Sequence, residues 1–305
     1  MKKIAIVTVN YNTEQDTINF LNSLKKIKAN GFNISVIVVD NGSKIVLKLK
    51  ESENVTLIRQ EENLGFTGGY NLGMKKALNE GADYVLIINN DTIVDEDMVS
   101  NLQQTLEQDK NIGAVVPKIY FAKGHEFHKD RYKKEDLGKV IWYAGGHTDW
   151  NHVQSIHRGV DEVDHGQYDD PGEVQFATGC CIMFKKEVLE KVGFFDDRYF
   201  LYYEDADLSE RIKRAGYKIY YVPKAILFHV NASSSGGAGK GNVLQDYFIT
   251  RNQMIFGMQY ASLRTKVALV KQGVNLLMKG RPEQRKAIRD YYLGKLGKGT
   301  FFKNK

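Results

Sequence analysis

The sequence predicts an α/β protein with a mostly parallel central sheet, flanked by helices and followed by a helical C-terminal extension. Three apolar runs bounded by polar turn residues are typical of strands buried on both faces: Lys3–Val9, Ile34–Val39 and Tyr84–Ile88. Such strands belong to parallel sheets that helices cover. Segments with helical periodicity lie between strand-like runs, and this alternation is the signature of a doubly wound sheet.

The remaining elements continue the alternation. We expect further strands at Val55–Ile58, Gly113–Pro117, Tyr217–Val222 and Ala225–Phe228. The apolar spacing predicts helices from Thr13 to about Ala29 and then at Val94–Gln108, Lys186–Val192, Val243–Tyr260 and Leu263–Met278. The stretch Phe121–Asp170 is more polar and holds six of the seven histidines, whose spacing matches no zinc pattern, so we expect solvated loop residues there.

Polar clusters follow three of the predicted strands, at Asn10–Asn12, Asp40–Ser43 and Asn89–Thr92. In open α/β sheets, ligands bind just beyond the carboxyl ends of the strands, so three clusters along one sheet edge predict a binding crevice. The third cluster places a carboxylate, Asp91, beside two amides, and hard oxygen ligands suit a divalent metal on a phosphate. The alternative is a turn that caps the next helix.

A glycine-rich stretch, Glu62–Gly73, precedes a predicted helix that continues to Leu78. It is neither a dinucleotide-binding fingerprint nor a phosphate-binding P-loop, because it lacks the spacing of the first and the Gly-Lys-Ser/Thr of the second. Two interpretations remain: a flexible turn, or a backbone that approaches a nucleotide closely, with Asn71 pointing into the crevice.

A second acidic cluster follows an aromatic run at Tyr199–Tyr203. Glu204, Asp205 and Asp207 lie at the start of a predicted helix, where the helix dipole favours anions. Simple capping would explain them. A carboxylate beside aromatic side chains is also partly desolvated, which raises its basicity and suits Asp205 to general-base catalysis.

Composition limits the remaining classes. The net charge is +6, yet residues 261–305 hold twelve Lys and Arg against two acids, so the basic tail is a distinct feature that suits an anionic surface. The tail lacks a nucleic-acid-binding motif, and Leu263–Met278 has a basic amphipathic pattern that suits either a membrane surface or packing on the catalytic domain.

No apolar run is long enough to span a membrane. The only cysteines, Cys180 and Cys181, are adjacent, which indicates buried thiols in a reducing cytoplasm.

Together these motifs resemble the inverting family 2 glycosyltransferases with the GT-A fold and, more narrowly, their rhamnosyltransferase-like bacterial members, which build cell-surface polysaccharides. The resemblance spans residue 3 to about residue 232, with a weaker echo in Arg251-Asn252. The motifs that carry it are 7–12 (Val-Thr-Val-Asn-Tyr-Asn), 38–43 (Val-Val-Asp-Asn-Gly-Ser), 62–66, 68–73, 89–91 (Asn-Asn-Asp), 193–196 (Gly-Phe-Phe-Asp) and 203–211.

The resemblance implies roles for particular residues. Asp205 would be the catalytic base with Glu204 beside it, and Mg²⁺ or Mn²⁺ would lie on Asp91 and His229. Asn89 stands where the family often has a first acid, which should weaken metal affinity while leaving a carbonyl ligand. The donor nucleotide-sugar would contact Thr8, Val9, Asn10, Tyr11, Asp40, Asn63, Gly65, Asn71, Asn89, Asn90 and Asp91. The acceptor would contact Trp142, Gly179, Cys180 and Tyr203.

The resemblance implies transfer of a sugar, with dTDP-L-rhamnose as first choice, to a hydroxyl of a growing, lipid-linked or oligosaccharide acceptor. The alternatives are a UDP-hexose or UDP-N-acetylhexosamine transferase, or a non-catalytic subunit that positions a glycan. A sugar nucleotidyltransferase is disfavoured because no basic signature follows the first strand. We expect a catalytic domain at 1–235, with a nucleotide-binding half to about 117 and an acceptor-binding half from about 118, and a basic extension at 236–305. We expect a cytoplasmic protein that can lie at the inner face of the cell membrane, binds no nucleic acid and can form a homodimer.

Overall fold

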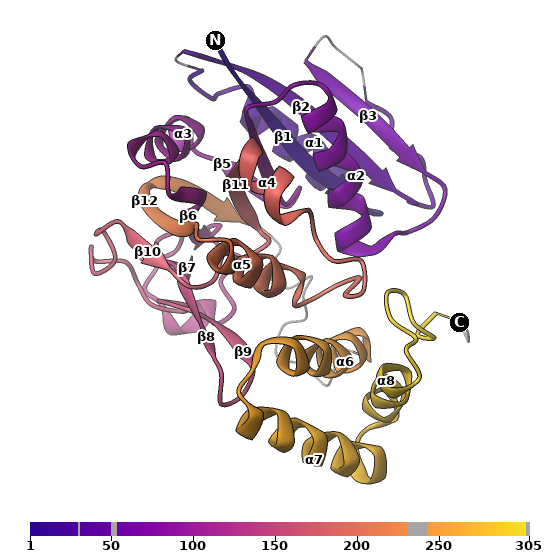
Figure 1. Ribbon diagram of the computed structural model, residues 1–305. Coiled ribbons are helices and arrows are strands. Elements are labelled where there is room, and N and C mark those ends of the chain that lie inside the picture. Colours follow the sequence, from indigo (N-terminus) through magenta and orange to yellow (C-terminus); the bar gives the residue numbers. More distant parts are fainter. Residues whose placement is uncertain (30, 50–53, 231–242, 303–305) are drawn as a thin grey trace.

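The computed structural model describes residues 1–29, 31–49, 54–230 and 243–302. One large twisted sheet forms its centre (Figure 1). From one edge to the other, its strands are β10 (Gly172–Val174), β12 (Lys218–His229), β6 (Ile112–Phe121), β11 (Cys181–Lys185), β4 (Tyr84–Ile88), β1 (Lys2–Asn10), β2 (Phe32–Asn41) and β3 (Val55–Gln60). Along this path only β10 and β11 run against the rest, so the predicted mostly parallel α/β sheet is confirmed.

Shorter strands extend the sheet and form a separate hairpin. These are β5 (Thr92–Val94), which pairs with β12, β7 (Ile141–Tyr143), which pairs with β6, and the hairpin of β8 (Gly146–Asp149) with β9 (Gln154–His157). The helices are α1 (Glu14–Leu24), α2 (Gly65–Asn79), α3 (Met98–Gln108), α4 (Lys186–Val192), α5 (Glu204–Arg214), α6 (Val243–Tyr260), α7 (Leu263–Lys279) and α8 (Pro282–Tyr292), with a 3₁₀ turn at Lys129–Arg131.

The core lies on both faces of the sheet. Every residue of β4 is buried, as its continuous apolar sequence predicts for a strand between two helical layers. Each fully buried aliphatic side chain of this kind contributes about 1.5–3 kcal/mol to stability. The helices α6, α7 and α8 form a separate group beside the sheet (Figure 1), and they supply the helical C-terminal extension that the sequence predicts.

Three predicted boundaries are wrong. Tyr217–Val222 and Ala225–Phe228 are one strand, β12, because a register shift between Val222 and Ile226 lets the chain continue past a proline. The helix expected from Val94 starts at Met98, because residues 92–94 pair with β12. The first helix ends at Leu24 rather than near residue 29. The backbone after it turns toward α3, where the Lys28 carbonyl accepts a hydrogen bond from the Ser100 hydroxyl.

The glycine-rich stretch is not the flexible turn of the first interpretation, because most of it is helical. It becomes helical at Gly65, and its glycines allow α2 to lie close to the sheet. A Cβ at Gly73 would come within 2.3 Å of Val7 Cγ1, and one at Gly69 within 3.0 Å of Val9 Cγ1. The small residues therefore serve helix–sheet packing.

Two smaller predictions have opposite outcomes. Cys180 and Cys181 are free and buried, as expected. The polar stretch predicted as loop contains strands β7 to β9, and His157 lies on β9 within an aromatic cluster, where burial lowers its pKa to about 4. The small polar run Asn231–Gly241, for which the sequence predicts a loop, lies outside the described residues. Among the described residues, no helix is both long and apolar enough to cross a bilayer.

Candidate active site

The carboxyl ends of β4, β1 and β2 lie next to one another, which confirms the predicted alignment of the three polar clusters. Asn10 pairs in register with Asp40, and the Asn10 amide donates to Asp40 Oδ1 over 2.9 Å. Beyond these ends lies a cavity of about 760 Å³. It is lined by Val9, Tyr11, Thr13, Asp16, Asn41, Asn63, Gly65, Phe66, Tyr70, Asn89, Asn90, Asp91, Phe200, Leu201, Val243, Leu244, Phe301 and Phe302.

Seven of the predicted donor-binding residues line this cavity: Val9, Tyr11, Asn63, Gly65, Asn89, Asn90 and Asp91. The other four, Thr8, Asn10, Asp40 and Asn71, are buried and do not line it. Only part of each polar strand end therefore lines the cavity, and the buried residues lie behind its wall.

Asp40 is fully committed to protein groups. Its carboxylate accepts from Asn10, from the Leu47 amide at 3.0 Å and from Arg59 at 2.8 Å, and its side chain has no exposed surface. These hydrogen bonds keep its pKa below the ordinary value although burial opposes the charge. Its position beneath the cavity suits it to holding the loop after β2.

Asn71 does not point into the crevice, contrary to the prediction. Its amide donates to the Phe195 carbonyl and to Asp197 Oδ1, both at 2.8 Å, and its oxygen accepts from the Phe195 amide at 2.9 Å. Asn71 thus fastens α2 to the Gly-Phe-Phe-Asp segment before α5. Gly65 faces the same region, because a Cβ there would lie 2.4 Å from the Phe200 carbonyl oxygen.

A polar frame surrounds the cavity floor. The Asn90 amide donates to Thr13 and Thr17 at 2.8 Å each, so the end of β4 is tied to the start of α1. The Tyr70 hydroxyl donates to Asn89 Oδ1 at 3.0 Å. The amide that replaces the family's first acid is therefore held in a fixed orientation toward α2.

Asp91 and His229 come together through strand pairing. Thr92 of β5 stands opposite His229 at the end of β12, and the Val230 amide donates to the Asp91 carbonyl at 2.8 Å. As a result, His229 Nε2 lies 3.2 Å from Asp91 Oδ1, although 138 positions separate them.

A carboxylate is a suitable ligand for Mn²⁺ or Mg²⁺, and an imidazole suits transition-metal ions. Such a cation at a phosphate is commonly held by one or two protein ligands plus substrate oxygens. His229 is buried, and its Nδ1 has no hydrogen-bond partner, so its ring is not held by a second polar group. The donor set therefore fits a divalent cation. Among the described residues, no cluster of three or more His, Cys, Asp or Glu is present, so substrate or water oxygens would complete the coordination.

Asp205 is the second residue of α5, and its carboxylate accepts hydrogen bonds from backbone amides. Its Oδ2 accepts from the Gly179 amide at 2.9 Å and its Oδ1 from the Ala206 amide at 2.8 Å. Burial raises the pKa of Asp205 to about 6, against these hydrogen bonds that lower it. A carboxylate with that pKa is ionised at neutral pH and still basic enough to accept a proton.

Glu204 differs sharply from its neighbour. It is buried, its Oε2 has no partner, and burial together with the nearby Asp205 charge raises its pKa well above the ordinary value. Burial disfavours the charged form of Glu204 that would act as a base, so Asp205 is the better candidate of the two predicted catalytic carboxylates.

The predicted acceptor-binding residues occupy structural positions around the site. Gly179 holds Asp205, and the carbonyl of Cys180 accepts from the Asn89 amide at 2.9 Å, so one loop links the base to the end of β4. Burial raises the Cys180 thiol pKa well above its ordinary value. The Trp142 ring packs edge-on against His229 at 4.8 Å, and Tyr203 donates to the Val153 carbonyl at 2.7 Å. None of the four lines the main cavity.

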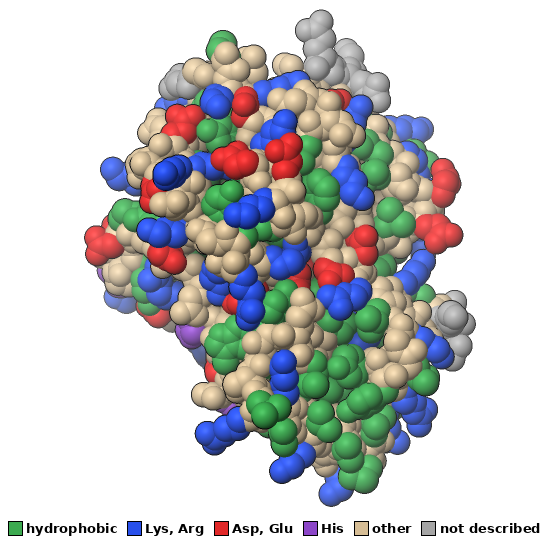
Figure 2. Space-filling view, in the orientation of Figure 1, with side chains coloured by type: hydrophobic (Ala, Val, Ile, Leu, Met, Phe, Trp, Pro, Cys, Tyr) green, Lys and Arg blue, Asp and Glu red, His purple; other side chains and the backbone are tan. Residues whose placement is uncertain are grey.

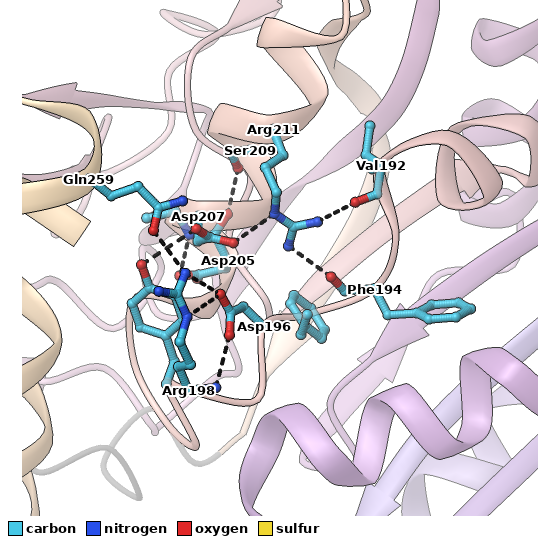
Figure 3. Close-up of polar contacts among 12 residues, drawn as sticks. Val192, Phe194, Asp196, Arg198, Asp205, Asp207, Ser209, Arg211 and Gln259 are labelled. Atoms are coloured by element: carbon cyan, nitrogen blue, oxygen red, sulfur yellow. Dashed lines mark hydrogen bonds and ion pairs between the residues drawn. The ribbon is translucent and has the colours of Figure 1, made fainter. Parts of the chain in front are cut away.

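Ion pairs fix the rest of α5 (Figure 3). Arg211 donates to Asp207 Oδ2 at 2.8 Å and to the Val192 and Phe194 carbonyls. The Ser209 hydroxyl donates to the Asp205 carbonyl at 2.7 Å. Asp207, the third acid of the predicted cluster, is thus a structural partner that anchors the helix.

The turn before Asp205 is strained. Phe200, Tyr202 and Tyr203 have φ values of 68°, 68° and 72°, a region that bulky side chains seldom occupy. Such a turn persists only where surrounding contacts determine it.

Two residues of α6 hold that turn, and only a weak signal in the sequence points to them. The Asn252 amide donates to the Tyr199, Leu201 and Tyr202 carbonyls at 2.8–2.9 Å. The Arg251 guanidinium donates to the Tyr199 carbonyl at 2.9 Å, and both α6 side chains are completely buried. We call Arg251 and Asn252 the α6 clamp. The signal for them in the sequence is that two polar residues stand side by side among the apolar residues of this helix.

Solved structures with this architecture are glycosyltransferases of the GT-A fold. GalNAc-T7 with UDP, GalNAc and Mn²⁺ aligns over 91% of this chain and 57% of its own, with a TM-score of 0.59 and 14% identity. The mannosyltransferase PcManGT from Pyrobaculum calidifontis, in complex with GDP-Man and Mn²⁺, aligns over 95% and 74%, with a TM-score of 0.50 and 14% identity. At such identities the likeness concerns the fold, and it confirms the predicted GT-A class.

The family model described as glycosyl transferase family 2 matches residues 5–193. Because this is more than half of the chain, the protein belongs to glycosyl transferase family 2. The chain is 27% identical over 252 residues to the poly-beta-1,6-N-acetyl-D-glucosamine synthase of Staphylococcus aureus (strain COL), covering 78% of this chain and 54% of that protein. It is 25% identical over 218 residues to the low-salt glycan biosynthesis hexosyltransferase Agl10 of Haloferax volcanii, covering 71% and 63%.

The chain spans about half the length of the staphylococcal relative. The comparisons show the family and the fold, while the activity of the chain and the narrower rhamnosyltransferase-like assignment stay predictions.

Proposed function

We propose that this glycosyltransferase is an inverting, metal-dependent enzyme that moves a sugar from a nucleotide-diphosphate donor to a hydroxyl of a growing cell-surface glycan. The observation that carries the proposal is the loop at Gly179-Cys180. It bonds to Asp205 on one side and to Asn89, two residues before Asp91, on the other. This loop couples a basic carboxylate to a carboxylate–imidazole pair at one end of the sheet.

The chemistry follows from these groups. Asp205 accepts the proton of the acceptor hydroxyl as that oxygen attacks the anomeric carbon. The bond from the anomeric carbon to the diphosphate breaks on the opposite face, so a single displacement inverts the configuration. Asp91 and His229 would hold a divalent cation, which would supply neutralisation of the negative charge on the leaving diphosphate. Burial and the nearby Asp205 charge raise the pKa of Glu204, which disfavours a second negative charge beside the base.

We propose dTDP-L-rhamnose as the first donor to test, on the motif resemblance. A UDP-linked hexose or N-acetylhexosamine is the second candidate, which the name of the staphylococcal relative favours. The seven cavity-lining residues predicted for the donor support binding of either nucleotide.

We further propose a lipid-linked or oligosaccharide acceptor at the inner face of the cell membrane, with the basic C-terminal region on that surface. We also propose a catalytic domain at 1–235 and an extension at 236–305. The extension contributes to the site, because the α6 clamp holds the turn before Asp205. Sedimentation velocity of the full chain distinguishes a monomer from a homodimer.

The experiment that tests the proposal is calorimetric titration of dTDP, UDP and GDP into the full chain, with and without Mn²⁺. Metal-dependent binding of dTDP over UDP supports a rhamnosyl donor. Preference for UDP keeps the glycosyltransferase and moves the donor to the second candidate. Binding of no nucleotide supports the non-catalytic alternative, a subunit that positions a glycan, and overturns the proposal.

A further inference from the structure

Helix α7 exposes an apolar face that nothing in the described structure covers. Leu263, Val267, Val270, Val274 and Met278 are 40–79% exposed, and their spacing of three or four residues places them on one side of the helix. Figure 2 shows hydrophobic side chains gathered over the part of the molecule where Figure 1 places α7 and α8. We call these five residues the α7 stripe.

The opposite side of the helix already packs on the protein. Leu269 and Gly273 are the buried residues of α7, and Gly273 lies against Met254 of α6. The helix therefore has two separate apolar faces, and only one is used for folding. An exposed contiguous apolar face of this kind marks an interaction site.

Charge decides which partner fits the stripe. Helix α7 has four basic residues and no acid. Its side chains Arg264, Lys271 and Lys279 are exposed, and Lys266 is half-buried. Apolar residues on one face with Lys and Arg beside them are the pattern of a helix that lies in the interface of an anionic bilayer.

A second copy of the chain fits poorly. In a two-fold dimer the stripe would meet its own copy, so basic residues of both helices would face one another with no acid of α7 to compensate. An anionic surface turns the same charges into an attraction, because polybasic segments bind negatively charged lipid headgroups.

We propose that α7 is a membrane-docking helix, with the α7 stripe immersed among anionic lipids and its basic residues on the headgroups. The helix follows α6 after a break of two residues, and α6 carries the clamp that holds the turn before Asp205. Docking through α7 therefore fixes the site relative to the bilayer. The inference rests on the proposed function only for the membrane acceptor, since lipid binding is measured without donor or acceptor.

The test is co-sedimentation of the full chain with vesicles of phosphatidylcholine alone or mixed with phosphatidylglycerol, at low and high salt. The stripe variant carries Val267→Ser, Val270→Ser and Val274→Ser. The matched control carries Ala268→Ser, Gln272→Ser and Asn275→Ser, at exposed positions of α7 outside the stripe. Neither variant changes the charge. We expect at least a tenfold loss of binding for the stripe variant and less than about a twofold loss for the control.

A third variant tests the electrostatic part. Lys271→Gln should weaken binding to the mixed vesicles by about fivefold and leave binding to phosphatidylcholine unchanged. No binding of the wild type to mixed vesicles, or equal losses in the stripe variant and its control, would overturn the proposal. So would a dimer in sedimentation velocity that the stripe variant dissociates.

Nucleotide binding by the same variants separates this inference from the proposed function. Nucleotide binding without vesicle binding overturns the α7 docking helix alone. Vesicle binding without nucleotide binding overturns the proposed transfer reaction alone.

Discussion

Replacing Asp205 by Asn tests whether a buried carboxylate is both the base of the reaction and a cost to stability. Burial raises the pKa of Asp205 from 3.8 to about 6. The unfolded chain releases this proton near pH 4, whereas the folded protein keeps it to about pH 6. Stability from this group is therefore complete at low pH and is lost as the pH rises through 6.

The size of the effect follows from linkage. Between about pH 4 and pH 7.5 the wild type should lose about 2 kcal/mol of unfolding free energy relative to Asp205→Asn. Asn cannot accept both the Gly179 and the Ala206 amide hydrogen bonds, so the variant also has a fixed cost. That cost does not depend on pH. The informative quantity is therefore how the difference in unfolding free energy between the two proteins changes with pH. The size of that difference at any single pH is not informative.

The assay is urea unfolding of both proteins across this pH range, combined with transfer rates and nucleotide titration. We expect Asp205→Asn to abolish transfer while it keeps nucleotide binding, and wild-type transfer to rise through about pH 6 as the base ionises. Parallel stability curves for the two proteins would refute the buried-carboxylate argument. Turnover near the wild-type rate would refute the assignment of the base.

Three further predictions concern other parts of the site. Asn252→Ala removes the side-chain donor from two partly buried carbonyls of the strained turn, and should cost about 2 kcal/mol and lower kcat more than KM, checked by thermal unfolding and transfer kinetics. Asp91→Ala should remove the Mn²⁺ dependence of nucleotide binding in calorimetry, and identical Mn²⁺ dependence would contradict the metal site. Gly73→Ala should cost about 1–3 kcal/mol by crowding Val7, whereas Lys75→Ala, exposed on the same helix, should cost little.

The sequence alone determined the sheet and its polar edge. Continuous apolar runs identify strands buried on both faces, and the polar residues directly after them must lie at one edge because parallel strands end together. The positions of Asn10, Asp40 and Asn89–Asp91 follow from that rule. The candidate base could also be predicted from the sequence, because the acidic cluster directly follows the aromatic run in the chain.

Only the tertiary structure decided what those residues face. Asn71 turns away from the cavity because helix α2 packs closely on the sheet through its glycines, which no local pattern reveals. His229 reaches Asp91 because β5 pairs with β12, a contact across 138 positions. The α6 clamp joins the C-terminal helices to the turn before Asp205. Periodicity reports which side of an element is apolar, but contacts between distant elements depend on how their surfaces pack, and that is a property of the folded chain.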